Sequence, residues 1–280
     1  MTLTIHREML QGSDEWRAAR RGLLTASTIA SVLTTKPPAP LDYACPQCNA
    51  EPGEDCISLA RKTPAPIKKP HDPRANLAAE NPDGLPDRIT LADSTTIRAV
   101  ALKLATERAT SWEDPDLYGF DIDRGHQVEP IARAWYADDR KVAVEQVGLM
   151  VLDLDGARLG YSPDGLVGDD GCIEIKGPRG KRHLLTHIEG AIPADHMPQV
   201  QTGMFVAGRS WCDFISYLGG EPPFVIRVHA DPAWFGAIES AVHAVEAKTF
   251  EFVNAYRAAT NGLAPTATLP DPYDVELKLA

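Results

Sequence analysis

The chain contains no apolar run approaching the roughly 20 residues that a membrane-spanning helix needs. Its first residues, MTLTIHREML, also lack the basic and then apolar regions of a secretory signal peptide. These two absences exclude the usual sequence signs of a membrane or exported protein. We therefore expect a cytoplasmic protein, and 280 residues suffice for one large domain or for one domain with an insertion.

Cysteine and basic residues are both scarce. Five cysteines, three of them clustered between residues 45 and 56, do not resemble the framework of a disulfide-rich secreted protein. Lysine and arginine number 28 against 39 aspartates and glutamates, which gives a formal net charge of −11. Such a charge argues against a protein that coats nucleic acid non-specifically, but it does not exclude a DNA enzyme with a local basic channel.

The basic residues that are present gather in three groups. A solvated charged face is the ordinary explanation of such groups, but each of these adjoins a motif described below. The groups are Arg17, Arg20 and Arg21; Arg61, Lys62, Lys68, Lys69 and Arg74; and Arg179, Lys181 and Arg182.

The stretch from Gly160 to Lys176, GYSPDGLVGDDGCIEIK, predicts a β-hairpin in which two short apolar runs flank a turn at residues 168–171. Because side chains alternate along a strand, Glu174 and Lys176 point to the same side, and Asp164 on the partner strand can face them. Two carboxylates held close together repel unless a cation lies between them. Oxygen ligands of this kind suit Mg²⁺ or Mn²⁺.

This hairpin resembles the signature of the PD-(D/E)XK nucleases, with Pro163-Asp164 followed by Glu174-Ile175-Lys176. Taken alone, so short a motif is common by chance. Asp164 can then be a turn residue, and Glu174 and Lys176 can be a solvated strand face. The resemblance implies that Asp164, Glu174 and the Ile175 carbonyl hold the metal ion. Lys176 would position or deprotonate the attacking water.

The N-terminal region predicts one helix and the start of another. Ser13 can cap a helix that Gly22 ends, and the following string LLTASTIASVL is typical of a second helix start. A helix N-terminus that carries Thr25 or Ser27 and faces Arg20 would suit a phosphate. Ordinary helix capping is the alternative explanation of these hydroxyls.

The string EWRAARRGLLTAS is similar to the N-terminal motif of the lambda-exonuclease family, whose members are YqaJ-type viral recombinases. The matching residues are Trp16, Arg20, Gly22, Thr25, Ala26 and Ser27. In that family the arginine and the serine hold the 5′-phosphate of a DNA end. The resemblance adds Ser162 and Arg182 to this phosphate-binding set.

Two further predicted helices carry residues that the resemblance assigns to the site. Glu129, in a helix over residues 124–137, matches a further acidic residue of the family, although a helix dipole also favours a carboxylate there. Gln199, in a helix over residues 194–207, also matches, but His196 stands where the family has tyrosine. Helical periodicity predicts two more helices, over residues 90–110 and 232–258.

Residues 36–90 are rich in proline and have the character of an insertion. They contain Cys45-Pro-Gln-Cys48, Cys56 and His71, a set of thiolate and imidazole ligands that suits zinc. The segment also resembles small zinc-binding modules of actinobacteria and their phages. Free thiols in a loop and a surface histidine are the alternative, but so short a segment has little core and needs a metal to order it. We expect one structural Zn²⁺.

The resemblance implies an α/β fold with a PD-(D/E)XK, restriction-endonuclease-like core, in which helices flank a central mixed β-sheet. We expect a nuclease domain at residues 1–35 and 91–262, an inserted zinc-binding module at 36–90 and an extended C-terminal tail at 263–280.

The expected function is that of a Mg²⁺-dependent (or Mn²⁺-dependent) exodeoxyribonuclease. It would degrade linear double-stranded DNA from 5′-phosphate ends in the 5′-to-3′ direction during phage-type recombination. The resemblance implies a homotrimeric ring, a single-strand annealing protein as partner and, for a phage protein, the host bacterial cytoplasm. The alternatives are a RecB- or Cas4-type nuclease of other polarity or an endonuclease, and a non-catalytic DNA-binding protein built on the zinc module. The phosphate pocket argues against the first and the acidic set against the second.

Overall fold

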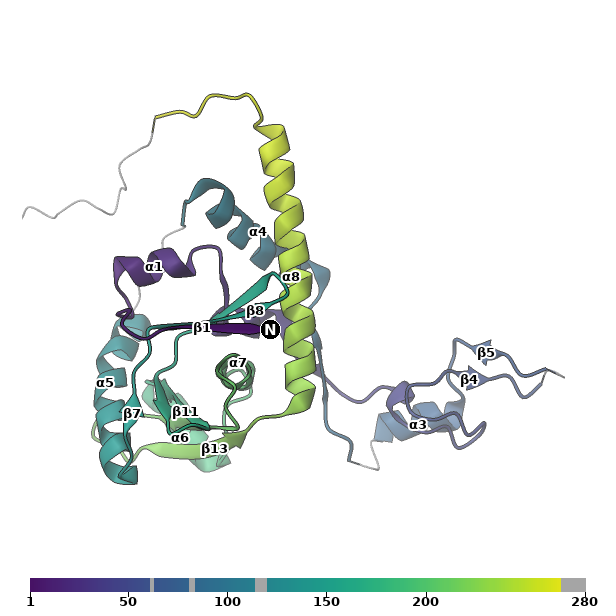
Figure 1. The fold of residues 1–280 in the computed structure, drawn as a ribbon. Coiled ribbons are helices and arrows are strands. Elements are labelled where there is room, and N and C mark those ends of the chain that lie inside the picture. The colour runs from purple at the N-terminus through teal and green to yellow at the C-terminus, as the bar shows by residue number, and fades with distance from the viewer. Residues whose placement is uncertain (61–62, 81–83, 114–119, 268–280) are drawn as a thin grey trace, which may run out of the picture.

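The strands form two main sheets in this computed structural model, which describes residues 1–60, 63–80, 84–113 and 120–267 (Figure 1). The four-stranded sheet has the order β1 (Thr2–His6), β8 (Leu149–Leu154), β9 (Ala157–Tyr161) and β2 (Leu24–Thr25). The five-stranded sheet has the order β13 (Phe224–His229), β12 (Trp211–Ser216), β11 (Gly171–Lys176), β10 (Gly165–Val167) and β7 (Val144–Glu145). Both sheets are mixed, because β2 pairs with β9 and β11 with β12 in parallel. The predicted mixed α/β class is confirmed, with the strands divided between two sheets.

The predicted hairpin is formed by β10 and β11. The two strands are antiparallel, with Gly165 opposite Ile173 and Val167 opposite Gly171. Gly168 begins the turn with φ +58°, a left-handed conformation that glycine adopts readily. Strand β11 lies inside the sheet, between β10 and β12, and its run from Gly171 to Ile175 is buried throughout. This burial explains why Cys172, Ile173 and Ile175 of the strand are apolar, and it makes Glu174 a buried charged residue.

Helix α7 (Met197–Ala207) packs against both sheets, through β8 and β9 on one side and β12 on the other. It is rich in apolar and small residues, as a helix buried on most sides must be. Gly203 faces Tyr161 of β9 so closely that a Cβ atom there would lie 2.6 Å from the tyrosine Cζ. The helix therefore holds the two sheets in one core.

Helices α4 (Ser94–Thr110) and α8 (Pro232–Ala259) lie along each other (Figure 1). Ile238 and Val242 of α8 are fully buried in the main core, and Asp231 caps the helix by accepting from the Ala233 N–H at 2.8 Å. The structure thus confirms the two helices that the periodicity predicted, although α4 begins at Ser94.

The N-terminal helices differ in part from the prediction. Helix α1 (Asp14–Arg20) is capped by the Ser13 hydroxyl, as predicted. The string LLTASTIASVL does not form one helix. It forms β2, a single turn α2 (Ala26–Ile29), the 3₁₀ turn η1 (Ala30–Val32) and the start of β3 (Leu33–Lys36). Strand pairing of β2 with β9 and of β3 with β6 (Arg88–Leu91) outweighs local helix propensity here.

Helices α5 and α6 flank the five-stranded sheet. Helix α5 (Phe120–Arg140) packs on β11 and carries Pro130 inside the helix. Helix α6 (Gly180–Glu189) follows β11 directly in the chain and packs against β13.

The segment between β3 and β6 projects away from the two main sheets (Figure 1). It contains η2 (Pro40–Asp42), the short antiparallel pair β4 (Cys56–Ile57) and β5 (Pro66–Ile67), and α3 (Asp72–Glu80). We call this segment, residues 37–87, the zinc module. Among the described residues of the whole chain, no helix is both long and apolar enough to cross a membrane.

Candidate active site and zinc site

The β10–β11 hairpin brings together the acidic residues that the motif predicts. Extending the register places Asp164 opposite Glu174, and the Asp164 Oδ2 accepts a 2.6 Å hydrogen bond from the Ile175 N–H. The Lys176 ammonium lies 2.7 Å from Glu174 Oε1, so the two side chains share one face as predicted. Lys176 also donates to Gln199 Oε1 of α7 at 3.0 Å. One hairpin and one helix thus assemble a carboxylate pair, an amine and an amide.

Glu129 of α5 is linked to Asp164 by Arg133, a residue that the sequence analysis missed. Arg133, one helical turn later, forms an ion pair with the Glu129 carboxylate, and its Nε donates to the Asp164 carbonyl at 2.5 Å. The i, i+4 spacing of the pair is visible in the sequence. The contact with Asp164 depends on how α5 packs on the sheet, and no local pattern reveals it.

Like charges dominate the electrostatics of this site. Burial, together with the negative charges of Glu174 and Glu129, holds the pKa of Asp164 well above its usual range. Burial alone would lower the pKa of Lys176, but the charges of Glu174 and Asp164 outweigh it and raise this pKa. The site therefore carries more negative charge than its own lysine compensates.

The donor set suits a hard divalent cation. Asp164 and Glu174 offer carboxylate oxygens, and the Ile175 N–H that bonds to Asp164 holds the two motif segments together. Burial first and then the neighbouring carboxylates raise the pKa of Asp164, and a bound cation would oppose both effects. The oxygens of Asp164, Glu174 and Glu129 do not all lie within 4.8 Å of one another, since among the described residues only a cysteine–histidine cluster meets that limit.

Two of the predicted phosphate-binding residues, Arg20 and Ser162, are in contact, and Ser162 lies two residues before Asp164. Its hydroxyl accepts from Arg20 Nη1 at 3.0 Å and from the Trp16 indole N–H at 2.9 Å. The Arg20 guanidinium also lies 4.2 Å from the centre of the Trp16 ring. The N-terminal motif named Trp16 and Arg20 and the family resemblance added Ser162, but the indole as a hydrogen-bond donor to Ser162 was not foreseen.

Ser27 is exposed and bonds with the Thr25 hydroxyl at 3.1 Å. Among the described residues, no hydrogen bond joins Ser27 to Ser162. Because Thr25 pairs with Gly160 in parallel, Ser27 nevertheless leaves the four-stranded sheet at the same end as Ser162.

Arg182 and His196 follow Lys176 in the sequence. Arg182, in the first turn of α6, forms an ion pair with Asp195. The His196 ring stacks on Phe214 with centroids 5.4 Å apart. Burial, with the charge of Lys176 as the next cause, lowers the pKa of His196 to about 4. His196 is therefore neutral at physiological pH.

The predicted zinc ligands meet in the zinc module. The ligand atoms of Cys45, Cys48, Cys56 and His71 all lie within 4.8 Å of one another, with Cys45 Sγ 3.5 Å from His71 Nδ1. Burial raises the pKa of the Cys45 thiol. Burial acts the same way on Cys56, but hydrogen bonds from the His71 backbone and from Arg74 outweigh it and lower its pKa to about 6. Four soft ligands in this arrangement fit a closed zinc site.

The basic group near this site is divided. Lys68 and Lys69 are exposed, as a DNA contact requires, whereas Arg74 is fully buried and is not part of a charged surface. Arg61 and Lys62 lie outside the described residues.

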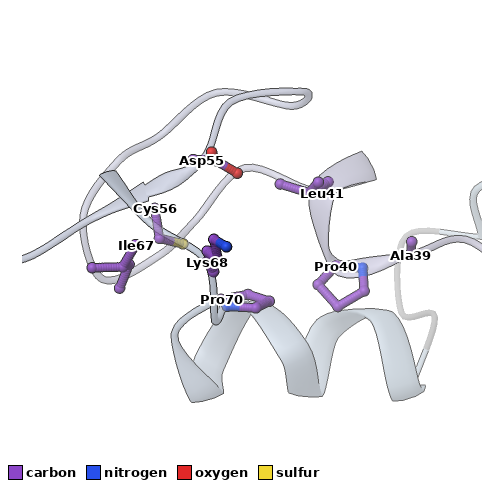
Figure 2. A pocket seen from close by; sticks show the side chains of 8 residues that line it. All are labelled: Ala39, Pro40, Leu41, Asp55, Cys56, Ile67, Lys68 and Pro70. Carbon is purple, nitrogen blue, oxygen red and sulfur yellow. The ribbon is translucent and has the colours of Figure 1, made fainter. Parts of the chain in front are cut away.

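Figure 2 shows a small pocket beside Cys56, with a volume of about 160 Å³. Most of its lining is apolar, with Asp55 and Lys68 as the charged members. It is lined by Ala39, Pro40, Leu41, Asp55, Cys56, Ile67, Lys68 and Pro70. The pocket contains none of the residues of the acidic site.

Comparison with known families gives two matches along the chain. Residues 92–210 match the YqaJ-like viral recombinase domain, and residues 12–94 match a family described as "Putative DNA-binding phage zinc finger domain". The second match also includes the string from Trp16 to Ser27. The chain is therefore similar to a YqaJ-like viral recombinase domain over residues 92–210 and to a phage zinc finger domain over residues 12–94, in line with the resemblances drawn from the motifs.

Two solved structures are similar to this chain over most of its length. They are the alkaline exonuclease LHK-Exo from Laribacter hongkongensis and the same enzyme in complex with dAMP. Each is 27% identical to this chain, with a TM-score of 0.59, and the match covers 90% of this chain and 100% of that one. No curated protein sequence matches.

Proposed function

We propose that this chain, with its YqaJ-like viral recombinase domain, is a metal-dependent deoxyribonuclease that degrades one strand of linear duplex DNA from a 5′-phosphorylated end. The observation that carries the proposal is the placement of Asp164, Glu174 and Lys176 two to fourteen residues beyond Ser162, which itself binds Arg20. A hydrolytic site and an anion site thus share one short stretch. The similarity to the alkaline exonuclease LHK-Exo supports the same assignment.

Asp164, Glu174 and the Ile175 carbonyl would hold a divalent cation, Mg²⁺ or Mn²⁺, with Glu129 alongside. When bound, this cation supplies Lewis acidity toward the scissile phosphate and lowers the pKa of a bound water. Arg133 anchors Glu129 and the Asp164 backbone to each other, and so keeps the third carboxylate beside the pair.

Lys176 acts as a hydrogen-bond donor that positions the attacking water. Its ammonium has three protons, of which one is directed at Glu174 and one at Gln199. The third remains for water or a phosphate oxygen. Because the neighbouring carboxylates raise the pKa of Lys176, it stays protonated and suits positioning better than proton abstraction.

Arg20 and Ser162, with Ser27 at the same end of the sheet, would bind the terminal 5′-phosphate, and Arg182 would contact the strand end. A guanidinium binds a phosphate by two charge-assisted hydrogen bonds. The stacking of Arg20 on Trp16 keeps the guanidinium plane oriented for this contact.

Digestion of matched duplexes tests the function. Linear duplex with 5′-phosphate ends should be degraded in the presence of Mg²⁺, the same duplex with 5′-hydroxyl ends more slowly, and closed circular DNA not at all. Equal cleavage of circular and linear DNA would favour the RecB- or Cas4-type alternative or an endonuclease. Binding without any cleavage would favour the non-catalytic zinc protein.

Arg20→Gln should selectively weaken the preference for 5′-phosphorylated ends, by about 10- to 100-fold, because a charge-assisted hydrogen bond contributes about 1.5–3 kcal/mol. The measurement is the ratio of kcat/KM values on phosphate and hydroxyl ends. Arg17→Gln is the matched control, since Arg17 is exposed on the same helix and pairs with Asp14. A fall in activity on both ends alike would contradict the assignment.

Lys176→Met should lower single-turnover cleavage by about 10²- to 10³-fold, the range for loss of one preorganised hydrogen-bond donor. Metal binding, followed by calorimetry, should persist because every oxygen ligand remains. Lys103→Met, on the exposed side of α4, is the control. Wild-type cleavage by Lys176→Met would remove lysine from the mechanism.

The partners and the domain division follow from the same proposal. We infer that double-stranded DNA ends are the substrate, that the chain forms a homotrimer and that a single-strand annealing protein uses its product. We further divide the chain into a nuclease domain (1–35 and 91–262), the zinc-binding insertion (36–90) and the tail (263–280). The pairing of β3 with β6, which closes the insertion at its base, supports this division.

A further inference from the structure

Arg74 lies at the centre of the zinc module, and its side chain is entirely removed from solvent. It is carried by α3, one turn beyond the zinc ligand His71, and its own N–H donates to the His71 carbonyl at 3.0 Å. A buried guanidinium is costly unless its charge and its five N–H donors are satisfied. The structure shows how both conditions are met.

The N–H donors of the guanidinium bond to backbone carbonyls that lie before Cys45 and between Cys48 and Cys56. Its Nε donates to the carbonyls of Pro40 and Tyr43, both at 2.8 Å, which precede Cys45. Its terminal nitrogens donate to the carbonyls of Glu51 at 3.0 Å and Glu54 at 2.7 Å, which precede Cys56. One side chain therefore joins the two loops that present three of the four ligands.

The guanidinium also contacts a zinc ligand directly. Arg74 Nη1 lies 3.4 Å from Cys56 Sγ, within hydrogen-bond range for sulfur. Three thiolates, one neutral imidazole and Zn²⁺ together carry a net charge of −1, since three negative charges oppose two positive ones. The positive charge of Arg74 balances this excess inside the module. Groups that hydrogen-bond to a metal ligand orient that ligand, and Arg74 can do this for Cys56.

We propose that Arg74 is the positioning residue of the zinc site, which fixes the Cys56 thiolate and the two ligand loops and thereby retains the metal. It is not a phosphate contact, although the sequence groups it with exposed lysines. The hydrophobic core of the module consists of little more than Cys45, Ala50 and Cys56. Arg74 replaces the missing apolar core with a network of hydrogen bonds.

The test compares Arg74→Met and Arg74→Lys in the full chain. Arg74→Met removes the charge and all donors at similar length. Arg74→Lys keeps the charge but cannot span carbonyls in two loops. We expect zinc release to a chelator to become about 10- to 100-fold faster in Arg74→Met, and to be accelerated to a smaller extent in Arg74→Lys. In the Co²⁺-substituted protein, the sulfur-to-cobalt charge-transfer band should shift in both variants, because the hydrogen bond to the Cys56 thiolate changes.

Arg88→Met is the matched control, because Arg88 belongs to the strand that closes the same segment but is partly exposed and pairs with Asp42 at 3.4 Å. Its zinc release should match the wild type. If Arg74→Met is insoluble, the release rate and the cobalt spectrum of Arg74→Lys decide the matter. Wild-type release and spectrum in Arg74→Lys would overturn the proposal. The proposal would also be overturned if the Arg74 variants retained zinc as the wild type does, while the salt dependence of their DNA affinity fell by about one phosphate contact.

Discussion

Asp164→Asn should abolish cleavage and at the same time raise the melting temperature of the metal-free protein. The variant loses a charged ligand, so the several kcal/mol of charge stabilisation that a catalytic metal supplies are lost, which corresponds to a rate at least about 10³-fold lower. Without metal, however, burial disfavours the ionised carboxylate, and the charges of Glu174 and Glu129 repel it. The neutral amide removes both penalties, and each kcal/mol gained raises the melting temperature of a protein of this size by roughly 2–4 °C.

The pH dependence of stability has a definite sign. The pKa of Asp164 is higher in the folded protein than in the unfolded chain, so the folded state binds more protons between these two values. Stability of the metal-free wild type must then fall as pH rises from about 4, the ordinary value for aspartate, through the folded pKa. Asp164→Asn should lack this loss. Added Mg²⁺ should stabilise the wild type increasingly as pH rises and should leave the variant unchanged.

Two comparisons make this prediction specific. Asp169→Asn, in the exposed turn of the same hairpin, should alter neither cleavage nor stability. Glu174→Gln should also abolish cleavage but should not stabilise, because it breaks the 2.7 Å ion pair with Lys176. Cleavage by Asp164→Asn at the wild-type rate, or a lower melting temperature of the metal-free variant at neutral pH, would show that this carboxylate is not part of a metal site.

The part of the site carried by the hairpin could be predicted because it depends on local rules. A turn of glycines and aspartates sets the register of β10 and β11, and the alternation of side chains places Glu174 and Lys176 on one face. The placement of Arg20 near Ser162 came from the family resemblance. No spacing in the sequence implies a contact between residues so distant along the chain.

The features that escaped prediction are those set by packing. Arg133 meets the Asp164 carbonyl only because α5 lies on the sheet, and the division of strands into two sheets follows from α7 packing between them. Arg74 illustrates the same limit in the zinc module. Its sequence neighbours are basic and proline-rich, which indicates a surface, yet the fold places it in the interior. A charge pattern cannot distinguish a solvated arginine from a buried one.

Loss of one zinc ligand should have the largest effect on the zinc module. Cys45→Ser should release the metal, because Cys45 lies beside both His71 and Cys56 and a hydroxyl is a much weaker zinc ligand than a thiolate. The buried Arg74 then faces loops without a metal to hold them, so residues 36–90 should lose their protection from hydrogen exchange and proteolysis. The main sheets have a separate core and should keep theirs.

Elemental analysis of the full chain provides the first measurement, with one Zn²⁺ per chain expected for the wild type and none for Cys45→Ser. Cys172→Ala is the control, because Cys172 is buried in the main core and should not change the zinc content. Mg²⁺-dependent cleavage of short duplexes should persist in Cys45→Ser at a reduced level, since Asp164, Glu174 and Lys176 lie outside the module. Wild-type protein without zinc would refute the zinc site. Complete loss of single-turnover cleavage on saturating DNA would instead show that the module supports the catalytic residues directly.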